Sequence, residues 1–119
     1  MLNEKTLHYL QQKNFVGELA EAIGVLKVYM GKPEGDCLVL SLLHDGDKVQ
    51  KIRFLAQGGP SLIACCAYVT EQLNSKNLAC LSSIDSEQLV QYFSLAKTEI
   101  SKAVLVEDAL KQLYKAVNQ

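Results

Sequence analysis

Four cysteines and two histidines are the residues of this chain best suited to nucleophilic or metal chemistry. Cys37, Cys65, Cys66 and Cys80 include no Cys-x-x-Cys pair and have no histidine at a zinc-finger spacing. In a reducing cytosol they are expected to be free thiols. Because cysteine is among the most buried residue types and Cys65-Cys66 lies in an apolar segment, we interpret them as core residues. Thiol chemistry at Cys65 or Cys66 stays open as an alternative, and it requires an exposed thiol with a lowered pKa.

Other catalytic constellations are missing from the sequence. His8 and His44 have no partners at metal spacing, and acid–base catalysis needs a positioned partner. We therefore interpret both histidines as surface or partly packed residues. The chain carries no Ser-His-Asp, phosphate-loop or dinucleotide motif. The sequence predicts a protein that is not an enzyme.

Length and charge narrow the functional classes. A chain of 119 residues forms one domain of ordinary size, 1–119, which buries roughly two-thirds of the surface of the unfolded chain. Its net charge is −1 with both signs interspersed, so nucleic acid is not an expected partner. Glu4 and Lys5 stand where a signal peptide needs apolar residues, and the longest apolar run, 62–69, is too short to cross a bilayer. We expect a cytoplasmic protein without a membrane contact.

The elements that must position any site begin with a helix and a sheet. Residues 2–13 suit a short N-terminal helix, and a second helical turn is expected around 18–23. Three strands are expected at 25–30, 37–43 and 48–55. Asp45-Gly46 predicts a hairpin turn between the last two, because both residues tolerate positive φ. The first half of the chain thus predicts a three-stranded antiparallel meander.

The third strand has one buried face, because Ile52 and Phe54 alternate with Lys51 and Arg53. From residue 61 the period becomes helical, with Ser61 as a candidate N-cap. The residues expected on the buried side of that helix are Leu62, Cys66, Val69 and Leu73.

Two further helices complete the expected fold. Asp85 predicts a helix start, with Gln88 three residues later and Ile84 placed to contact Leu89. A last helix from about Ser101 is expected to pair Glu107 with Lys111 on its surface. Its expected buried residues are Leu105, Ala109, Leu113 and Val117. Strands followed by helices predict an α+β domain with helices packed on one face of the sheet.

Several short sequence blocks, spread over about a hundred residues, together carry a resemblance to a known family. They are His8-Tyr9, Asn14–Gly17, Gly35-Asp36, Ile52–Phe54, Gly58, Ser61–Ala64, Val69–Glu71 and Leu105–Ala109. In this order the chain resembles the NifU N-terminal/IscU family of iron–sulfur cluster assembly scaffolds. The resemblance implies the α+β fold of that family, in which a nascent cluster or zinc is held on three cysteine thiolates.

The three cysteine positions of the family hold Glu34, Gly59 and Lys102 in this chain, and only Asp36 survives from the cluster site. The resemblance implies that these four residues converge as a vestigial cluster site. Cluster assembly needs soft thiolate ligands, whereas Glu34 is a hard oxygen donor, Gly59 has no side chain and Lys102 is a cation. We therefore expect no cofactor, neither an iron–sulfur cluster nor zinc.

Two interpretations of Glu34 and Lys102 stay open. They form a salt bridge that replaces the metal as a tie between two loops, or they are two solvated side chains. A surface pair contributes about 0–1 kcal/mol. Cys37 follows Asp36 on a strand and should point the other way, and Cys65 lies about two helical turns beyond Gly59, so neither replaces a ligand.

The resemblance leads to a first hypothesis, a scaffold-family protein that has lost cluster binding and acts through protein contacts. Its expected partner is a cysteine desulfurase or an intact scaffold. Leu95–Glu99 stands where the family offers Leu-Pro-Pro-Val-Lys to an Hsp70-type chaperone, so the full partner set of the family is not expected. The alternatives are a binding or oligomeric module that reuses the fold, and a thiol enzyme using Cys65 or Cys66.

Overall fold

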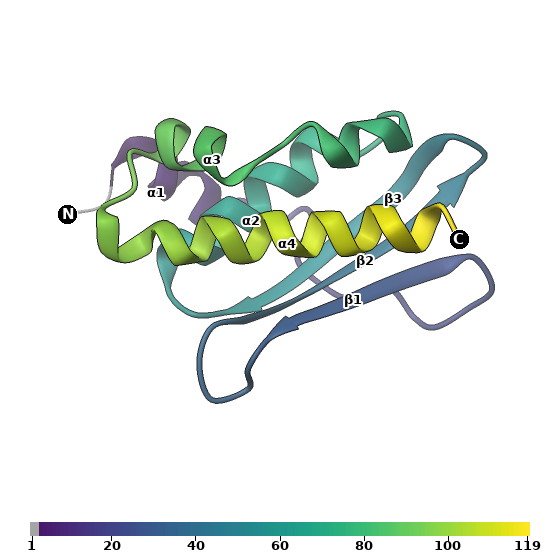
Figure 1. Cartoon of the computed structure of the whole chain (residues 1–119), viewed down its shortest axis with the longest axis horizontal. Helices are drawn as coiled ribbons and strands as arrows, with labels where there is room; N and C mark the ends of the chain where they lie inside the picture. Colours follow the sequence, from purple (N-terminus) through teal and green to yellow (C-terminus); the bar gives the residue numbers. More distant parts are fainter. Residues whose placement is uncertain (1–2) are drawn as a thin grey trace.

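A computed structural model describes residues 3–119, and its helices cover one face of a three-stranded antiparallel sheet (Figure 1). The strands are β1 (Val25–Gly31), β2 (Cys37–Asp45) and β3 (Lys48–Gln57). The helices are α1 (Glu4–Gln11), α2 (Pro60–Leu73), α3 (Ser86–Phe93) and α4 (Ile100–Val117), with the 3₁₀ helices η1 (Leu78–Ser82) and η2 (Lys97–Glu99). The expected α+β fold is confirmed.

The sheet is a meander in which β2 lies between β1 and β3. The loop between β2 and β3 is one residue later than expected. Asp45 still pairs with Lys48, and the loop is Gly46-Asp47, with Gly46 at φ 60°. The register is also irregular between Leu43 and His44: Leu43 pairs with Lys51 and His44 with Val49, which leaves Gln50 of β3 as the extra, unpaired residue.

Alternation along β3 holds as predicted. Ile52 and Phe54 are buried against the helices, while Lys51 is exposed and Arg53 lies over the Phe15 ring on the other face. The helix-facing residues of β2 are Leu38, Leu40 and Leu42, and all of them are buried. The core therefore lies between the sheet and α2 and α4.

Helix α2 buries the four residues that the spacing predicts, and Cys65 as well. Its start differs from the expectation. Gly59 is the N-cap residue and Pro60 the first helical residue, so Ser61 is not the N-cap. Proline suits this position because the first N–H of a helix has no intrahelical partner.

Helix α4 buries a stripe slightly rotated from the predicted one. Leu105 and Val117 are only half-buried, and the fully buried residues are Ala103, Val106, Ala109, Leu110 and Leu113. Because α4 contacts β1, α2, α3 and η1 together, its buried face is wider than one sheet contact requires.

A carboxylate joins α3 to α4. Asp85 caps α3 as predicted, since its Oδ1 accepts a hydrogen bond of 2.9 Å from the Gln88 N–H. Glu107 accepts from Lys111 at 2.6 Å, as predicted, and from the Ser86 N–H at 2.6 Å. Lys111 first, and then the Ser86 N–H, lowers the pKa of Glu107 to about 2.

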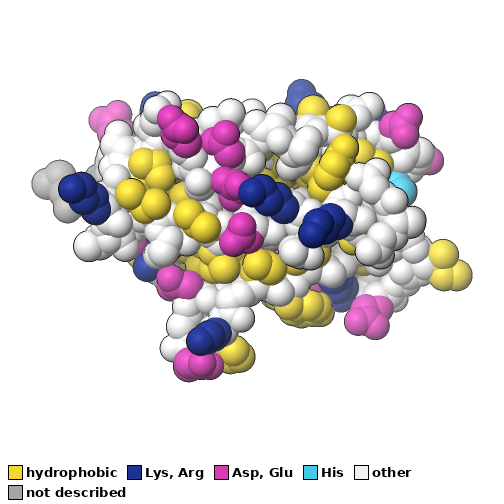
Figure 2. All heavy atoms as spheres, in the orientation of Figure 1, with side chains coloured by type: hydrophobic (Ala, Val, Ile, Leu, Met, Phe, Trp, Pro, Cys, Tyr) yellow, Lys and Arg dark blue, Asp and Glu magenta, His cyan; other side chains and the backbone are white. Residues whose placement is uncertain are grey.

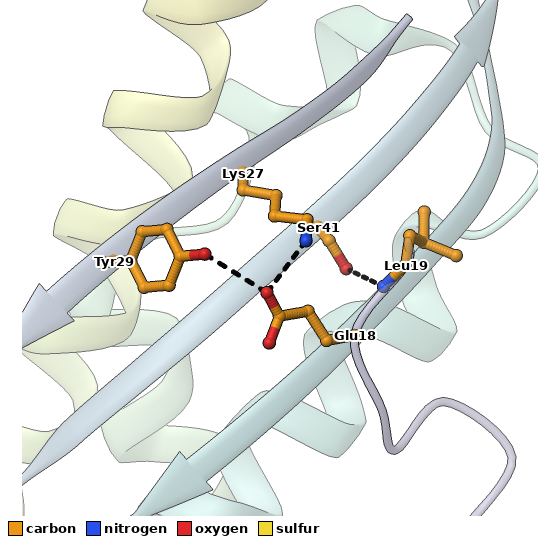
Figure 3. A network of polar contacts seen from close by, with 5 residues as sticks. All are labelled: Glu18, Leu19, Lys27, Tyr29 and Ser41. Carbon is orange, nitrogen blue, oxygen red and sulfur yellow. Dashed lines mark hydrogen bonds and ion pairs between the residues drawn. The ribbon is translucent and has the colours of Figure 1, made fainter. Parts of the chain in front are cut away.

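The N-terminal segment departs most from the prediction. Helix α1 ends at Gln11, short of residue 13, and Leu2 lies outside the described residues. The helical turn expected at 18–23 is wrong. Residues 16–24, here called the strap, run without helix across the outer face of the sheet (Figure 3).

Hydrogen bonds to the sheet explain why the strap is extended. The Gly17 N–H donates to the Phe54 carbonyl at 2.8 Å, and the Leu19 N–H donates to Ser41 Oγ at 2.9 Å. Both N–H groups would otherwise have to find helical partners. Tertiary contacts therefore override the local helical preference.

The surface is mixed in charge. Figure 2 shows acidic and basic side chains interspersed over the face that α4 forms. Within residues 3–119, no helix combines the length and apolar character needed to span a bilayer.

Candidate functional site

Three segments far apart in sequence meet at one end of the sheet, on the left in Figure 1: the β1–β2 hairpin, the turn before α2 and the first turn of α4. Lys102 Nζ lies 3.1 Å from Asp36 Oδ2 and 3.2 Å from Glu99 Oε2. The Lys102 side chain is only 19% exposed. Asp36 first, and then Glu99, raises the pKa of Lys102, so this amine stays a cation.

Gly58 lies in the turn before α2 and brings this segment against Asp36 of the β1–β2 hairpin. Its φ is 148°, and a Cβ at this position would overlap the Asp36 carboxylate and Leu62. Only glycine allows the backbone of the turn to approach Asp36 this closely. The structure therefore brings Asp36, Gly58 and Lys102 together.

Gly59 follows directly but differs in its surroundings. Its φ is 92°, and a Cβ there would meet no heavy atom within 4 Å. Its carbonyl accepts a hydrogen bond of 3.3 Å from the Ile63 N–H in the first turn of α2. Gly59 thus lies beside the Asp36 contact, next to open space.

Glu34 does not join this cluster. Of the two interpretations left open for Glu34 and Lys102, the structure does not form the salt bridge between them, because Lys102 pairs with Asp36 and Glu99 instead. The Lys32 N–H donates to the Asp36 carbonyl at 3.1 Å and the Gly35 N–H donates to the Lys32 carbonyl at 3.0 Å. These bonds close the hairpin and leave Glu34 exposed at its tip. No ion pair of Glu34 occurs within residues 3–119.

Glu99 is the member of the cluster that the sequence analysis missed. It lies three residues before Lys102, and an acid at that spacing reaches a lysine on the same helical face. This local signal could have identified Glu99 as a partner.

The donor set here does not fit a cluster or a zinc ion. Asp36 offers one hard carboxylate, and that group already binds an ammonium. In the part of the chain that the structure describes, no group of three or more His, Cys, Asp or Glu side chains could hold a metal ion. The chemistry of this end of the sheet is ionic pairing between protein groups.

The cysteines lie apart from this cluster. Cys65 and Cys66 are both fully buried, and burial raises the pKa of Cys65 to about 12 and that of Cys66 further. Both thiols therefore stay protonated and shielded. Cys80 is half-buried against the core, and Cys37 lies in a hollow on the outer face of the sheet.

The fold and the three segments define an iron–sulfur scaffold-like domain. Residues 1–119 match the family model described as the NifU-like N terminal domain. This chain belongs to that NifU/IscU-like scaffold family.

Two curated relatives are about 30% identical to this chain over the aligned residues. "Iron sulfur cluster assembly protein 1, mitochondrial" of Yarrowia lipolytica is 31% identical over 114 residues, which cover 92% of this chain and 62% of that protein. The protein of the same name from Eremothecium gossypii is 30% identical over 112 residues, covering 91% and 72%. The chain thus spans less than two-thirds of the length of the first relative.

Solved structures show the same fold at low identity. The N-terminal domain of a NifU-like protein from Brucella abortus has a TM-score of 0.74 at 14% identity, covering 98% of this chain and 93% of that one. A protein described as a candidate cluster assembly scaffold of the SUF system, from Fervidobacterium islandicum AW-1, has a TM-score of 0.72 at 18% identity, covering 94% and 95%.

Proposed function

We propose that this member of the scaffold family has lost cluster and metal binding and acts through protein–protein contacts in iron–sulfur biogenesis, as a regulator or accessory factor. One observation carries the proposal. The Lys102 ammonium, at the position where the resemblance implies a ligand thiolate, lies 3.1 Å from Asp36, the one residue that the resemblance retains from the family's site. A cation there repels iron and occupies the carboxylate.

The ion pairs of Lys102 give the loops a tie that needs no metal. They connect the β1–β2 hairpin, through Asp36, to η2 and the start of α4, through Glu99. Each pair is partly exposed and contributes about 0–1 kcal/mol, so the tie orients the loops and adds little stability. A surface of the family's shape can then persist without a ligand set.

The proposed partner is a cysteine desulfurase or an intact scaffold, since either could meet a scaffold-like surface without needing a cluster. Residues Lys97–Glu99 form η2, and Glu99 forms an ion pair with Lys102, so this segment is engaged within the chain, which supports a partner set narrower than that of the family. Nucleic acid and membranes have no place in the proposal, and the proposed location is the cytoplasm.

The alternatives receive less support. A thiol enzyme needs a reachable thiolate, whereas Cys65 and Cys66 are buried with raised pKa values. A binding module that reuses the fold for another task remains the competing proposal. A direct binding experiment separates that module from a protein of cluster biogenesis.

That experiment measures capture of the purified desulfurase and intact scaffold of the same organism by this chain, and the metal content of the chain before and after anaerobic treatment with iron and sulfide. We expect capture of one of the two proteins, no stoichiometric metal and no cluster absorption. Capture of neither protein would refute the proposed role, and one equivalent of zinc or a stable cluster would refute the loss of metal binding.

A matched pair of variants locates the contact. Lys102→Met removes the ammonium at the convergence of the loops, and Lys111→Met removes a similar ammonium farther along the same helix. We expect the first variant to weaken capture and the second to leave it unchanged. Equal effects would place the contact elsewhere.

A further inference from the structure

The two edges of the sheet differ in how far other segments of the chain hydrogen-bond to them. The β3 edge is covered, since Phe54 exchanges hydrogen bonds with Phe15 and Gly17, and Val49 exchanges bonds with residues 75–76. β1 forms the opposite edge. Within residues 3–119, the Val25 N–H, which donates to the Ala22 carbonyl, is the one main-chain group of β1 that hydrogen-bonds outside the sheet.

The pairing of β1 with β2 identifies which groups point outward. The Lys32 N–H donates to the Asp36 carbonyl, so Met30 and Val28, at two-residue steps, also face β2 in hydrogen-bonded pairs. The N–H and C=O groups of Lys27 and Tyr29 therefore project from the free edge. Such a row is a template for another strand.

The charge of Lys27, which could otherwise oppose the pairing of another strand with this edge, is neutralised by Glu18. Lys27 Nζ lies 2.9 Å from Glu18 Oε2, and the Lys27 side chain is only 13% exposed. The same carboxylate accepts a hydrogen bond of 3.1 Å from the Tyr29 hydroxyl (Figure 3). Lysine and proline commonly block edge strands, but here the lysine lies along the sheet and β1 contains no proline or bulge.

Apolar surface adjoins the edge on both sides. Tyr29 is 64% exposed and borders an open hollow of about 450 Å³ on the outer face, together with Val39 and Leu55. On the helix side, a groove lies between β1 and the last turns of α4, lined by Val28, Met30 and Ala116 among others. Helix α4 therefore does not close over the strand.

We propose that the β1 edge pairs with β1 of a second copy of this chain, antiparallel and with Val28 on the two-fold axis, to make a six-stranded sheet. In this register each Lys27 lies opposite the Tyr29 of the other copy, and each Leu26 lies opposite a Met30. The outward groups of Lys27 and Tyr29 then satisfy each other.

Charge complementarity favours a second copy as the partner and the register that places Lys27 opposite Tyr29. Each copy brings Lys27 and Glu18 to the same edge, with Glu21 also near Lys27 and Tyr29 on the outer face and Lys115 in the groove on the helix side, so the two copies place Lys27 beside the acidic Tyr29–Glu18 pair of the other. A shift by two residues in one direction would put Lys27 opposite Lys27, which like-charge repulsion disfavours. A shift in the other direction would put Lys27 opposite Gly31 and lose the ionic contact.

The test measures the mass of the full chain over a concentration series by light scattering or sedimentation. We expect the measured mass of the wild type to approach twice the chain mass of 13.1 kDa as the protein concentration rises. Tyr29→Lys, which sets a second cation beside the partner's Lys27, should remain a monomer. Leu55→Lys is the matched control on the same face, 41% exposed but two strands away from the edge, and should still dimerise.

A cross-link tests the register independently of the mass. Val28 faces its own copy across a narrow non-hydrogen-bonded pair, whose Cα separation suits a disulfide. Val28→Cys should give a disulfide-linked dimer on mild oxidation, reversible by reductant, above the background that the native cysteines give in the wild type. A wild type that stays monomeric, equal losses in the two lysine variants, or no cross-link above background would overturn the proposal.

Discussion

Gly58 and Gly59 offer a controlled comparison, because the same alanine substitution meets crowding at one position and open space at the next. At Gly58, a Cβ overlaps the Asp36 carboxylate and the Leu62 side chain, whereas at Gly59 nothing lies within 4 Å. Both residues have positive φ, 148° and 92°. The backbone strain of an L-residue is therefore common to both variants, and the contacts differ.

The magnitude follows from these contacts. Strain at such backbone angles costs about 1–3 kcal/mol in either variant. Gly58→Ala also displaces Asp36 from Lys102, worth about 0–1 kcal/mol, and presses on buried Leu62, for which overpacking costs about 1–3 kcal/mol. We expect Gly58→Ala to be less stable than Gly59→Ala by about 1–4 kcal/mol, or a Tm lower by about 4–16 °C for a domain of this size.

Thermal and urea unfolding of the two variants measure this difference. Adding Lys102→Met gives a double-mutant cycle. Because Gly58→Ala already disturbs the pair of Asp36 and Lys102, the double variant should lose less stability than the sum of the losses in the two single variants. Equal stability of the two alanine variants, or strict additivity in the cycle, would show that Gly58 does not hold Asp36 against Lys102.

Three further predictions concern the core, acid stability and the site. Cys66→Ser should lower the free energy of unfolding by about 1–3 kcal/mol, and the native Cys66 thiol should resist thiol reagents until unfolding; rapid labelling of the native protein would contradict its burial. Since folding lowers the pKa of Glu107 to about 2, its contribution is full above the unfolded value of about 4.5 and is lost as the pH falls from there toward 2. Glu107→Gln should therefore flatten the loss of stability over that range in pH-dependent urea unfolding, and an unchanged slope would refute the assignment. The triple change Glu34→Cys, Gly59→Cys and Lys102→Cys should acquire about one equivalent of zinc by metal analysis only if the hairpin tip moves toward Lys102; the exposed position of Glu34 and the φ of 92° at Gly59 are its two obstacles, and a variant that folds but binds no zinc would count against convergence of the three positions.

Local patterns were sufficient for the framework of the fold. Two-residue alternation around Ile52 and the apolar spacing after Pro60 depend on the period of one element, and the Asp85 cap depends on a bond three residues away. Each of these signals is complete within a short window of sequence. The elements that they predict are present in the structure.

The strap and the ion pair of Lys102 were not predictable in the same way. The strap is extended because Gly17 and Leu19 find partners on β3 and β2, more than twenty residues later in the chain. Lys102 could have been paired with either acid of the hairpin, and the choice of Asp36 over Glu34 depends on which side of a tight turn each residue occupies. Both features depend on tertiary packing, and a periodic pattern within one element carries no information about such packing.

The two glycines also differ in what the fold requires of them. Gly58 is required by the packing of the turn against Asp36 and Leu62, whether or not a metal is bound nearby. At Gly59 an added Cβ would meet no heavy atom within 4 Å, so only the φ of 92°, and not the packing of the core, disfavours a side chain at that position. Nor does the core depend on the site for its stability, because the buried residues of the sheet, α2 and α4 form one continuous cluster. The packing of this turn therefore requires glycine at position 58, whereas it leaves space for a side chain at position 59.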